Sequence, residues 1–260
     1  MDMNLTQNER REYLIRYLSE EQNMSDRAIP NDIEAQKRML RGLMNVRSPK
    51  PIHAEFLRVQ DEYLQEELSQ KHITSVGDLI PLEQGIYVWQ GDITTLACDA
   101  IVNAANSGMT GCYYPCHGCI DNAIHSYAGV QLRLDCDAII KAQGHEEPTG
   151  TAKITKAYNL PCKYVLHTVG PIITGALTKK EEELLADCYR SCLVLAEENG
   201  LKSIAFCCIS TGEFRFPNQR AAEIAVETVR EYRKRTGSEI EVIFNVFKDI
   251  DDDIYRELLE

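Results

Sequence analysis

Four side chains able to bind a metal ion lie within a stretch of eight residues, CYYPCHGC. They are Cys112, Cys116, His117 and Cys119, and thiolate sulfur with imidazole nitrogen is a donor set that zinc favours in proteins. Glycine and proline interrupt the stretch, which favours a folded-back loop over a helix. Cys116 and His117 are adjacent, so their side chains usually diverge, and we expect only one of them to join the other two cysteines. Three ligands leave an open coordination position, as in catalytic zinc sites, whereas four would close the site. A sulfur-rich loop without metal is the alternative.

Two further loops carry polar groups that could bind a ligand. In GDITTLACDAIVNAANSGMTG (91–111) a strand ends at VNAAN, so Asn103 and Asn106 should lie at the carboxyl edge of a sheet, where ligands collect in open α/β folds. Their amides could bond hydroxyl groups, or they could only shape the turn. In CISTGEFRFPNQRAAEIAV (208–226) a strand, a loop of small residues and a helix start follow one another. This order favours an anion site made of backbone N–H groups.

The elements that must position these loops change character near Gly85. After it, short apolar strands alternate with amphipathic helices, which predicts a three-layer α/β/α domain over residues 85–260. The expected strands are 86–90, 99–104, 152–158, 163–169, 203–209 and 241–247, and the expected helices are 120–142, 180–199 and 218–235. Residues 1–84 instead show three helical stripes and few strand signals, which predicts a helical N-terminal extension.

The bulk composition is that of an ordinary globular protein. The chain has 260 residues, of which 44% are hydrophobic and 26% charged, and it has no apolar run as long as a membrane span. The polar N-terminus does not resemble a secretory signal, and most of the ten cysteines lie in apolar segments, so we expect buried, reduced thiols in a cytoplasmic protein. A net charge of −12 repels polyanions, so nucleic acid is not an expected partner.

Four motifs in order, GDIT, DAIVNAAN, HTVGP and ISTGEFRFP, resemble the macrodomain, an ADP-ribose-binding module. The likeness covers about residues 85–260. The stretch GCYYPCHGCIDNAIH further resembles the zinc-containing macrodomains of bacteria and fungi, whose signature is G-C-x-x-P-x-H-x-C-I-D-N-x-I-H. A helical N-terminal extension fits the same subgroup. The implied fold is a three-layer α/β/α macrodomain with a mixed central sheet.

The resemblance also implies ligand-binding roles. Asp92 would contact the adenine amino group, with Ile93 beside the ring, and Asn103 and Asn106 would lie near the distal ribose. The diphosphate would be wrapped by backbone amides of Ser210, Thr211, Gly212, Glu213 and Phe214.

The implied zinc ligands are Cys112, His117 and Cys119, which would form the catalytic group together with Asn106. Cys116 falls on a variable position of the signature. Asp121 and His125, four residues apart after the ligands, could orient the metal site, or they could serve only a helix start and packing.

The activity that the resemblance implies is zinc-dependent removal of mono-ADP-ribose from modified proteins, at the ester that joins aspartate or glutamate to the distal ribose. Zinc beside that ribose would lower the pKa of bound water from about 15.7 towards about 7, or polarise the ester as a Lewis acid. The expected partners are a mono-ADP-ribosylated protein, in this subgroup a lipoyl-carrier protein, and ADP-ribose as product. Two alternatives stay open: a reader that binds ADP-ribose with structural zinc, and a deacetylase of O-acetyl-ADP-ribose.

Overall fold

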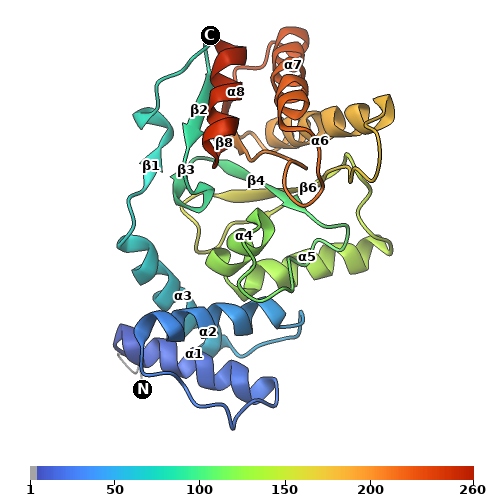
Figure 1. The fold of residues 1–260 in the computed structure, drawn as a ribbon. Coiled ribbons are helices and arrows are strands. Elements are labelled where there is room, and N and C mark those ends of the chain that lie inside the picture. Colours follow the sequence, from blue (N-terminus) through green and yellow to red (C-terminus); the bar gives the residue numbers. More distant parts are fainter. Residues whose placement is uncertain (1–4) are drawn as a thin grey trace.

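The computed structural model describes residues 5–260, and a six-stranded sheet lies at its centre (Figure 1). In spatial order the strands are β2 (Ile86–Gln90), β8 (Glu241–Val246), β7 (Ser203–Phe206), β4 (Ala100–Ala105), β6 (Tyr164–Val169) and β5 (Ala152–Lys156). Neighbouring strands run parallel, except that β5 is antiparallel to β6. All six predicted strands are present, and the mixed sheet is confirmed.

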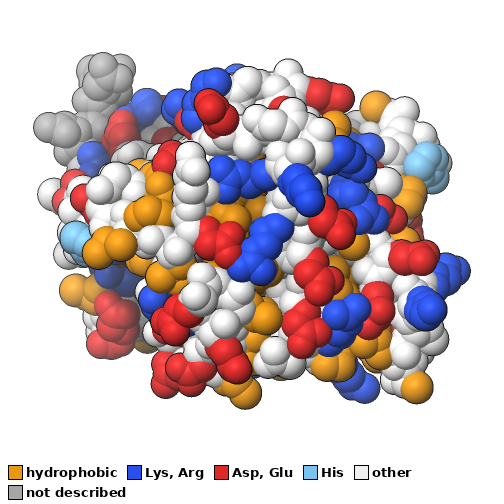
Figure 2. Space-filling view, turned by 90° about the horizontal axis from the view of Figure 1, so that it is seen from above, with side chains coloured by type: hydrophobic (Ala, Val, Ile, Leu, Met, Phe, Trp, Pro, Cys, Tyr) orange, Lys and Arg blue, Asp and Glu red, His pale blue; other side chains and the backbone are white. Residues whose placement is uncertain are grey.

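Helices cover both faces of this sheet (Figure 1). On one face lie α6 (Lys179–Glu198), α7 (Asn218–Thr236) and α8 (Asp249–Leu259), and on the other lie α4 (Ile120–Ala128) and α5 (Val130–Gln143). This covering explains why β4, β6 and β8 are buried along almost their whole length. Seen from above, the side of α6, α7 and α8 carries charges of both signs interspersed (Figure 2). The predicted three-layer α/β/α fold is therefore confirmed.

The single helix predicted over 120–142 is in fact two helices, α4 and α5, because the chain turns sharply at Gly129. This glycine has φ 101°, and a Cβ added there would lie only 2.6 Å from Gln60 Nε2. The buried Gln60 also accepts a 2.9 Å hydrogen bond at its Oε1 from the Val130 amide. The turn is thus a docking point for a residue 69 positions earlier in the chain, a contact that helical periodicity does not reveal.

The N-terminal region forms three helices, α1 (Gln7–Glu21), α2 (Ile33–Val46) and α3 (Ala54–Ser69), which lie beneath α4 and α5 in Figure 1. Their apolar side chains form a hydrophobic cluster separate from that of the sheet, and Val130 at the start of α5 completes it. The predicted helical extension is confirmed for the described residues, and residues 1–4 lie outside them. Its boundary at 84/85 stays a prediction. Within residues 5–260, no helix combines the length and the apolar character needed to cross a bilayer.

Candidate active site

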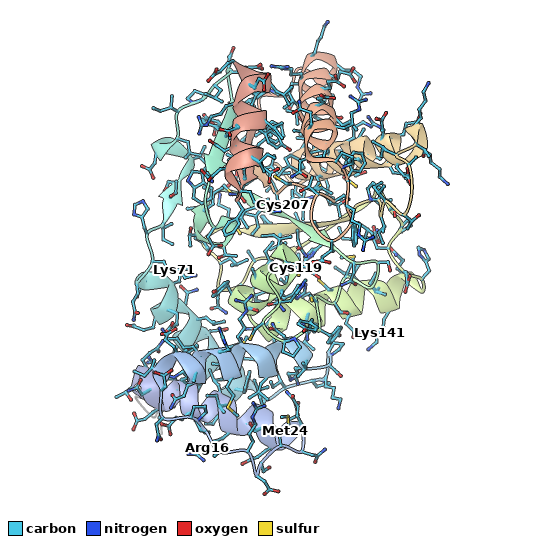
Figure 3. All side chains as sticks on the ribbon, viewed as in Figure 1. Arg16, Met24, Lys71, Cys119, Lys141 and Cys207 are labelled. Carbon is cyan, nitrogen blue, oxygen red and sulfur yellow. The ribbon has the colours of Figure 1, made fainter. Side chains whose placement is uncertain are left out.

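Parts of all three loops singled out above lie at the same edge of the sheet. The segment 106–119 follows β4 and the segment 207–217 follows β7, and β4 and β7 are parallel neighbours. Loops that follow parallel strands meet at the carboxyl edge, where open α/β sheets bind ligands. Figure 3 shows Cys119 near the middle of the molecule, between the sheet and the N-terminal helices.

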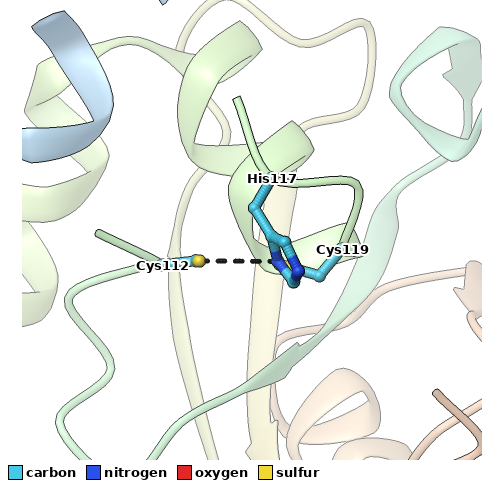
Figure 4. A group of neighbouring side chains, drawn as sticks. All are labelled: Cys112, His117 and Cys119. Carbon is cyan, nitrogen blue, oxygen red and sulfur yellow. Dashed lines mark hydrogen bonds between the residues drawn. The ribbon is translucent and has the colours of Figure 1, made fainter. Parts of the chain in front are cut away.

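Cys112, His117 and Cys119 come together in this loop (Figure 4). Their donor atoms all lie within 4.8 Å of one another, and the sulfur of Cys112 is 3.7 Å from Nδ1 of His117. All three are partly exposed, so the group has a side open to a ligand. Cys116 turns away from it, with a left-handed φ of 54° and its thiol 3.2 Å from the backbone carbonyl of Arg38. The loop therefore offers three donors on one side and directs the fourth candidate towards α2.

Cys119 also caps the N-terminus of α4, because its sulfur accepts a 3.4 Å hydrogen bond from the Asn122 amide. Burial raises the pKa of the Cys119 thiol to about 12; the Asn122 amide opposes this shift, and nearby Cys112 adds to it. At neutral pH the thiol therefore keeps its proton until a metal ion displaces it.

A second group of possible metal donors lies inside the protein. His125, Cys136 and His167 also have donor atoms within 4.8 Å of one another, but all three are buried. The ring of His167 already has neighbours: the Thr155 hydroxyl is 2.9 Å from Nε2, and the Asn103 amide nitrogen is 3.2 Å from Nδ1. Burial lowers the pKa of both histidines, so both rings are neutral. Either group could hold an ion, but only the loop group is open to solvent.

Asp121 connects the end of β4 to the start of α4. Its buried carboxylate accepts hydrogen bonds from Asn103 at 2.8 Å and from Asn106 at 3.3 Å. Burial raises the pKa of Asp121 to about 6, and these two amides oppose the shift. Asn106 also donates to the Gly111 carbonyl and accepts from the Gly108 amide. Asn106 thus fixes the turn that leads to the cysteine loop, whereas the fully buried Asn103 orients Asp121.

The predicted phosphate loop is a tight turn in which the Thr211 amide, expected to bind the diphosphate, instead donates to the Cys208 carbonyl at 3.4 Å. Ser210 has a φ of 66°, and its carbonyl accepts a 2.9 Å bond from the Phe216 amide across the turn. Within the described residues, the backbone N–H groups of Gly212, Glu213 and Phe214 have no hydrogen-bond acceptor. An anion could bind to such consecutive free amides. The two loops also meet, since a carboxylate oxygen of Glu213 lies 3.7 Å from Nε2 of His117.

The GDIT segment is placed differently from the two loops at the sheet edge. Asp92 caps a short 3₁₀ helix, η2 (Ile93–Thr95), by accepting from the Thr94 amide at 3.0 Å. Its other carboxylate oxygen is 3.7 Å from Lys71 of the N-terminal region. Ile93 is only 1% exposed and packs in the core. Asp92 is 44% exposed at its side chain, which leaves part of the carboxylate accessible to a ligand.

Three residues around the cysteine loop were missed at the sequence level: Arg41, Asn45 and Asn122. Asn122 lies inside the IDNAIH motif, which was a usable signal. Arg41 and Asn45 belong to α2, more than sixty residues before the loop, and nothing in their local sequence marks them.

Comparisons with known proteins identify the family to which the chain belongs. The macro domain family model matches residues 102–225. A protein-ADP-ribose hydrolase of Treponema medium is 60% identical over 260 residues, covering 98% of this chain and 100% of the relative. One from Staphylococcus aureus (strain MSSA476) is 52% identical over 251 residues, covering 95% and 94%. Among solved structures, a Trypanosoma brucei macrodomain in complex with ADP-ribose is 31% identical with a TM-score of 0.66, covering 81% of this chain and 92% of that chain. The chain therefore belongs to the macro domain family of protein-ADP-ribose hydrolases.

Proposed function

We propose that this protein is a zinc-dependent hydrolase that removes mono-ADP-ribose from aspartate or glutamate esters on modified proteins. The observation that carries the proposal is the meeting of two loops. One loop, residues 112–119, carries three metal donors, and the other, residues 207–217, carries three consecutive free amides. The contact of His117 with Glu213 joins them. A nucleotide diphosphate on the amides would thus have its distal sugar directed towards the metal donors.

The donor set fits zinc. Two thiolates and one imidazole are a common ligand group for this ion, and the open side leaves a position for substrate or water. Zinc bound by Cys112, His117 and Cys119 would supply positive charge where the ester bond or the attacking water needs polarisation. The proposal also places this chain in the zinc-containing subgroup of the family.

The rest of the site would bind and orient the substrate. The amides of Gly212, Glu213 and Phe214 would hold the diphosphate, with Ser210 and Thr211 shaping the turn. Asn106 would stand beside the distal ribose, held by its bonds to Asp121 and to the loop backbone.

At the other end of the nucleotide, Asp92 would bind the adenine amino group through the accessible part of its carboxylate. Because Ile93 is buried, it would contribute the backbone and floor of the adenine pocket rather than an exposed side chain. Asn103 would not touch the ribose itself. It would support the ribose-binding residues by donating its hydrogen bond to Asp121.

The proposed macromolecular substrate is a mono-ADP-ribosylated protein, and a lipoyl-carrier protein is the specific candidate. The negative net charge of −12 fits a protein that takes only the modified side chain into its site rather than an extended polyanion. Free ADP-ribose would be the product.

The test measures release of ADP-ribose from a glutamate-modified protein by the zinc-loaded enzyme, by chelated enzyme, and by Cys119→Ser and Cys116→Ser variants. We expect chelation and Cys119→Ser to abolish release, and Cys116→Ser to retain it because that thiol faces α2. Substrates linked through arginine, and O-acetyl-ADP-ribose, test the specificity for protein esters. Full release by metal-free enzyme would contradict the zinc requirement, and tight ADP-ribose binding without release would favour a reader.

A further inference from the structure

The cysteine loop is held from outside by α2 of the N-terminal extension. Arg41, in the third turn of this helix, reaches the loop with its guanidinium group. It donates to the backbone carbonyl of His117 at 3.2 Å and to the side-chain oxygen of Asn122 at 2.8 Å. One side chain of the extension thus fixes both a proposed metal ligand and the first turn of α4.

Asn45 holds the loop at Cys116, where the backbone is left-handed. Its side-chain oxygen accepts a 2.8 Å hydrogen bond from the Cys116 amide, and its nitrogen donates to the Ser126 hydroxyl at 2.9 Å. Cys116 has a φ of 54°, a left-handed conformation that a residue with a Cβ adopts only when its surroundings hold it there. Because Cys116 immediately precedes His117, this conformation sets the direction of the histidine. Asn45 is 1% exposed, so water cannot replace its bonds.

Asn122, which Arg41 contacts, is hydrogen-bonded to two positions of the loop. Its side-chain nitrogen donates to the carbonyl of Tyr114 at 3.0 Å, and its backbone amide donates to the sulfur of Cys119 at 3.4 Å. The guanidinium of Arg41 fixes which way the Asn122 amide faces, because it occupies the oxygen side. The Ser126 hydroxyl, 3.4 Å from the same oxygen, is a weaker second partner, so removing Arg41 takes away the main hydrogen bond that orients this amide.

The helix that carries these residues is itself fastened to α5. The buried Arg133 donates to the carbonyls of Asn45 at 2.7 Å and Met44 at 3.3 Å, at the C-terminal end of α2. The same guanidinium lies 4.4 Å from the centre of the Tyr113 ring, beside Cys112. The loop is therefore enclosed between α2 and α5 at several points, although it has no regular secondary structure of its own.

We infer that Arg41 and Asn45 are positioning residues of the metal site, and that they hold residues 112–119 in the metal-binding conformation before the ion arrives. The inference rests on the proposed metal role of Cys112, His117 and Cys119. Outer partners of metal ligands contribute about 10- to 100-fold to metal affinity in proteins, because the ligands then need no reordering on binding. The extension would thereby act on the reaction without touching the substrate.

The experiment compares Arg41→Met with Arg38→Ala in the full-length protein. Methionine keeps an unbranched side chain with a similar helix propensity but removes the guanidinium donors of Arg41. Arg38 is the matched control, since its exposed side chain has no hydrogen-bond or ion-pair partner among residues 5–260 and its backbone carbonyl survives the substitution. Zinc affinity is measured by competition with a chromophoric chelator. Cobalt(II) is then added to each apo-protein, and its thiolate charge-transfer and ligand-field bands report the geometry of the site.

We expect Arg41→Met to weaken zinc binding about 10- to 100-fold and to shift or broaden the cobalt bands, with the helical circular dichroism unchanged. Arg41→Lys, which can still donate to one of the two acceptors, should recover part of the affinity, and Arg38→Ala should match the wild type. Wild-type affinity and an unchanged cobalt spectrum in Arg41→Met would overturn the inference. If the wild-type protein itself binds no zinc at the cysteine loop, the proposed function fails instead, so the two failures are distinct.

Discussion

Replacing Gly111 with alanine introduces a methyl group just before the cysteine loop, against two buried side chains. A Cβ at this position would lie 2.8 Å from the ring of His125 and 3.1 Å from the Arg133 guanidinium. Neither neighbour can withdraw easily, because both side chains are buried. Gly111 also has a φ of 83°, a conformation that side chains other than glycine rarely adopt. The loop must therefore move outward, and Cys112 moves with it.

The cost has two parts. Holding a residue with a Cβ in the left-handed region costs about 1–2 kcal/mol, and overpacking a filled interior adds about 1–3 kcal/mol. The free energy of unfolding should therefore fall by about 2–5 kcal/mol. For a domain of this size, that corresponds to a loss of about 4–20 °C in the melting temperature of the metal-free protein. Displacement of Cys112 should in addition weaken zinc binding by about tenfold or more.

Gly118 provides the matched control in the same loop. A Cβ there would meet no atom within 4 Å, and its backbone is not left-handed. Thermal unfolding of the two metal-free variants, followed by circular dichroism, gives the stability difference, and chelator competition gives the zinc affinities. We expect Gly118→Ala to resemble the wild type in both measurements. Equal melting temperatures and equal affinities for the two variants would refute the packing argument.

Two further predictions concern other parts of the site. Gly170→Ala would place a Cβ against the hydroxyl oxygen of Ser210, so calorimetry should show weaker ADP-ribose binding with zinc affinity unchanged. Gly175→Ala is the control, because a Cβ there meets no atom within 4 Å, and equal ADP-ribose affinities in both variants would contradict the role of that turn. Burial lowers the pKa of His167 to about 3, so the folded protein keeps this ring neutral while the unfolded chain binds a proton below about pH 6.5. As the pH falls from 6 to 4, this group should lower the free energy of unfolding by about 1.4 kcal/mol per pH unit. Urea titrations at several pH values measure how the free energy of unfolding depends on pH, and for His167→Gln this dependence should be weaker by that amount. An unchanged dependence would mean that the ring is protonated in the folded protein.

Local patterns predicted the sheet well. Each strand is a short apolar run bounded by turn residues. A strand that is buried on both faces must be apolar at nearly every position, so the sequence marks it clearly. The helix over 120–142 was predicted as one element because its composition stays helical across Gly129. The break depends on Gln60, which reaches it from α3, and no local signal records such a contact.

The site, too, has one part that the sequence predicts and one part that it does not. The types and spacing of Cys112, Cys116, His117 and Cys119 were enough to nominate a metal loop, because thiols and imidazole are common zinc ligands. The choice of His117 over Cys116 came from the family resemblance. The partners of that loop were not visible. Arg41 and Asn45 are ordinary helix residues in sequence, and only the packing of α2 against α4 gives them their contacts. Positioning residues in general are set by tertiary distance, so they are the part of a site that a single sequence hides.

The bond between the Gln60 side chain and the Val130 amide, together with the share of Val130 in the helical cluster, has an evolutionary consequence. The extension and the sheet domain therefore share a hydrogen bond and part of a hydrophobic cluster, and exchanging one without the other would break both. A macrodomain that acquired only the cysteine loop, by recombination, would lack the amide and guanidinium partners that α2 provides. Such a lineage would have to inherit the helices together with the loop or recruit another segment in their place.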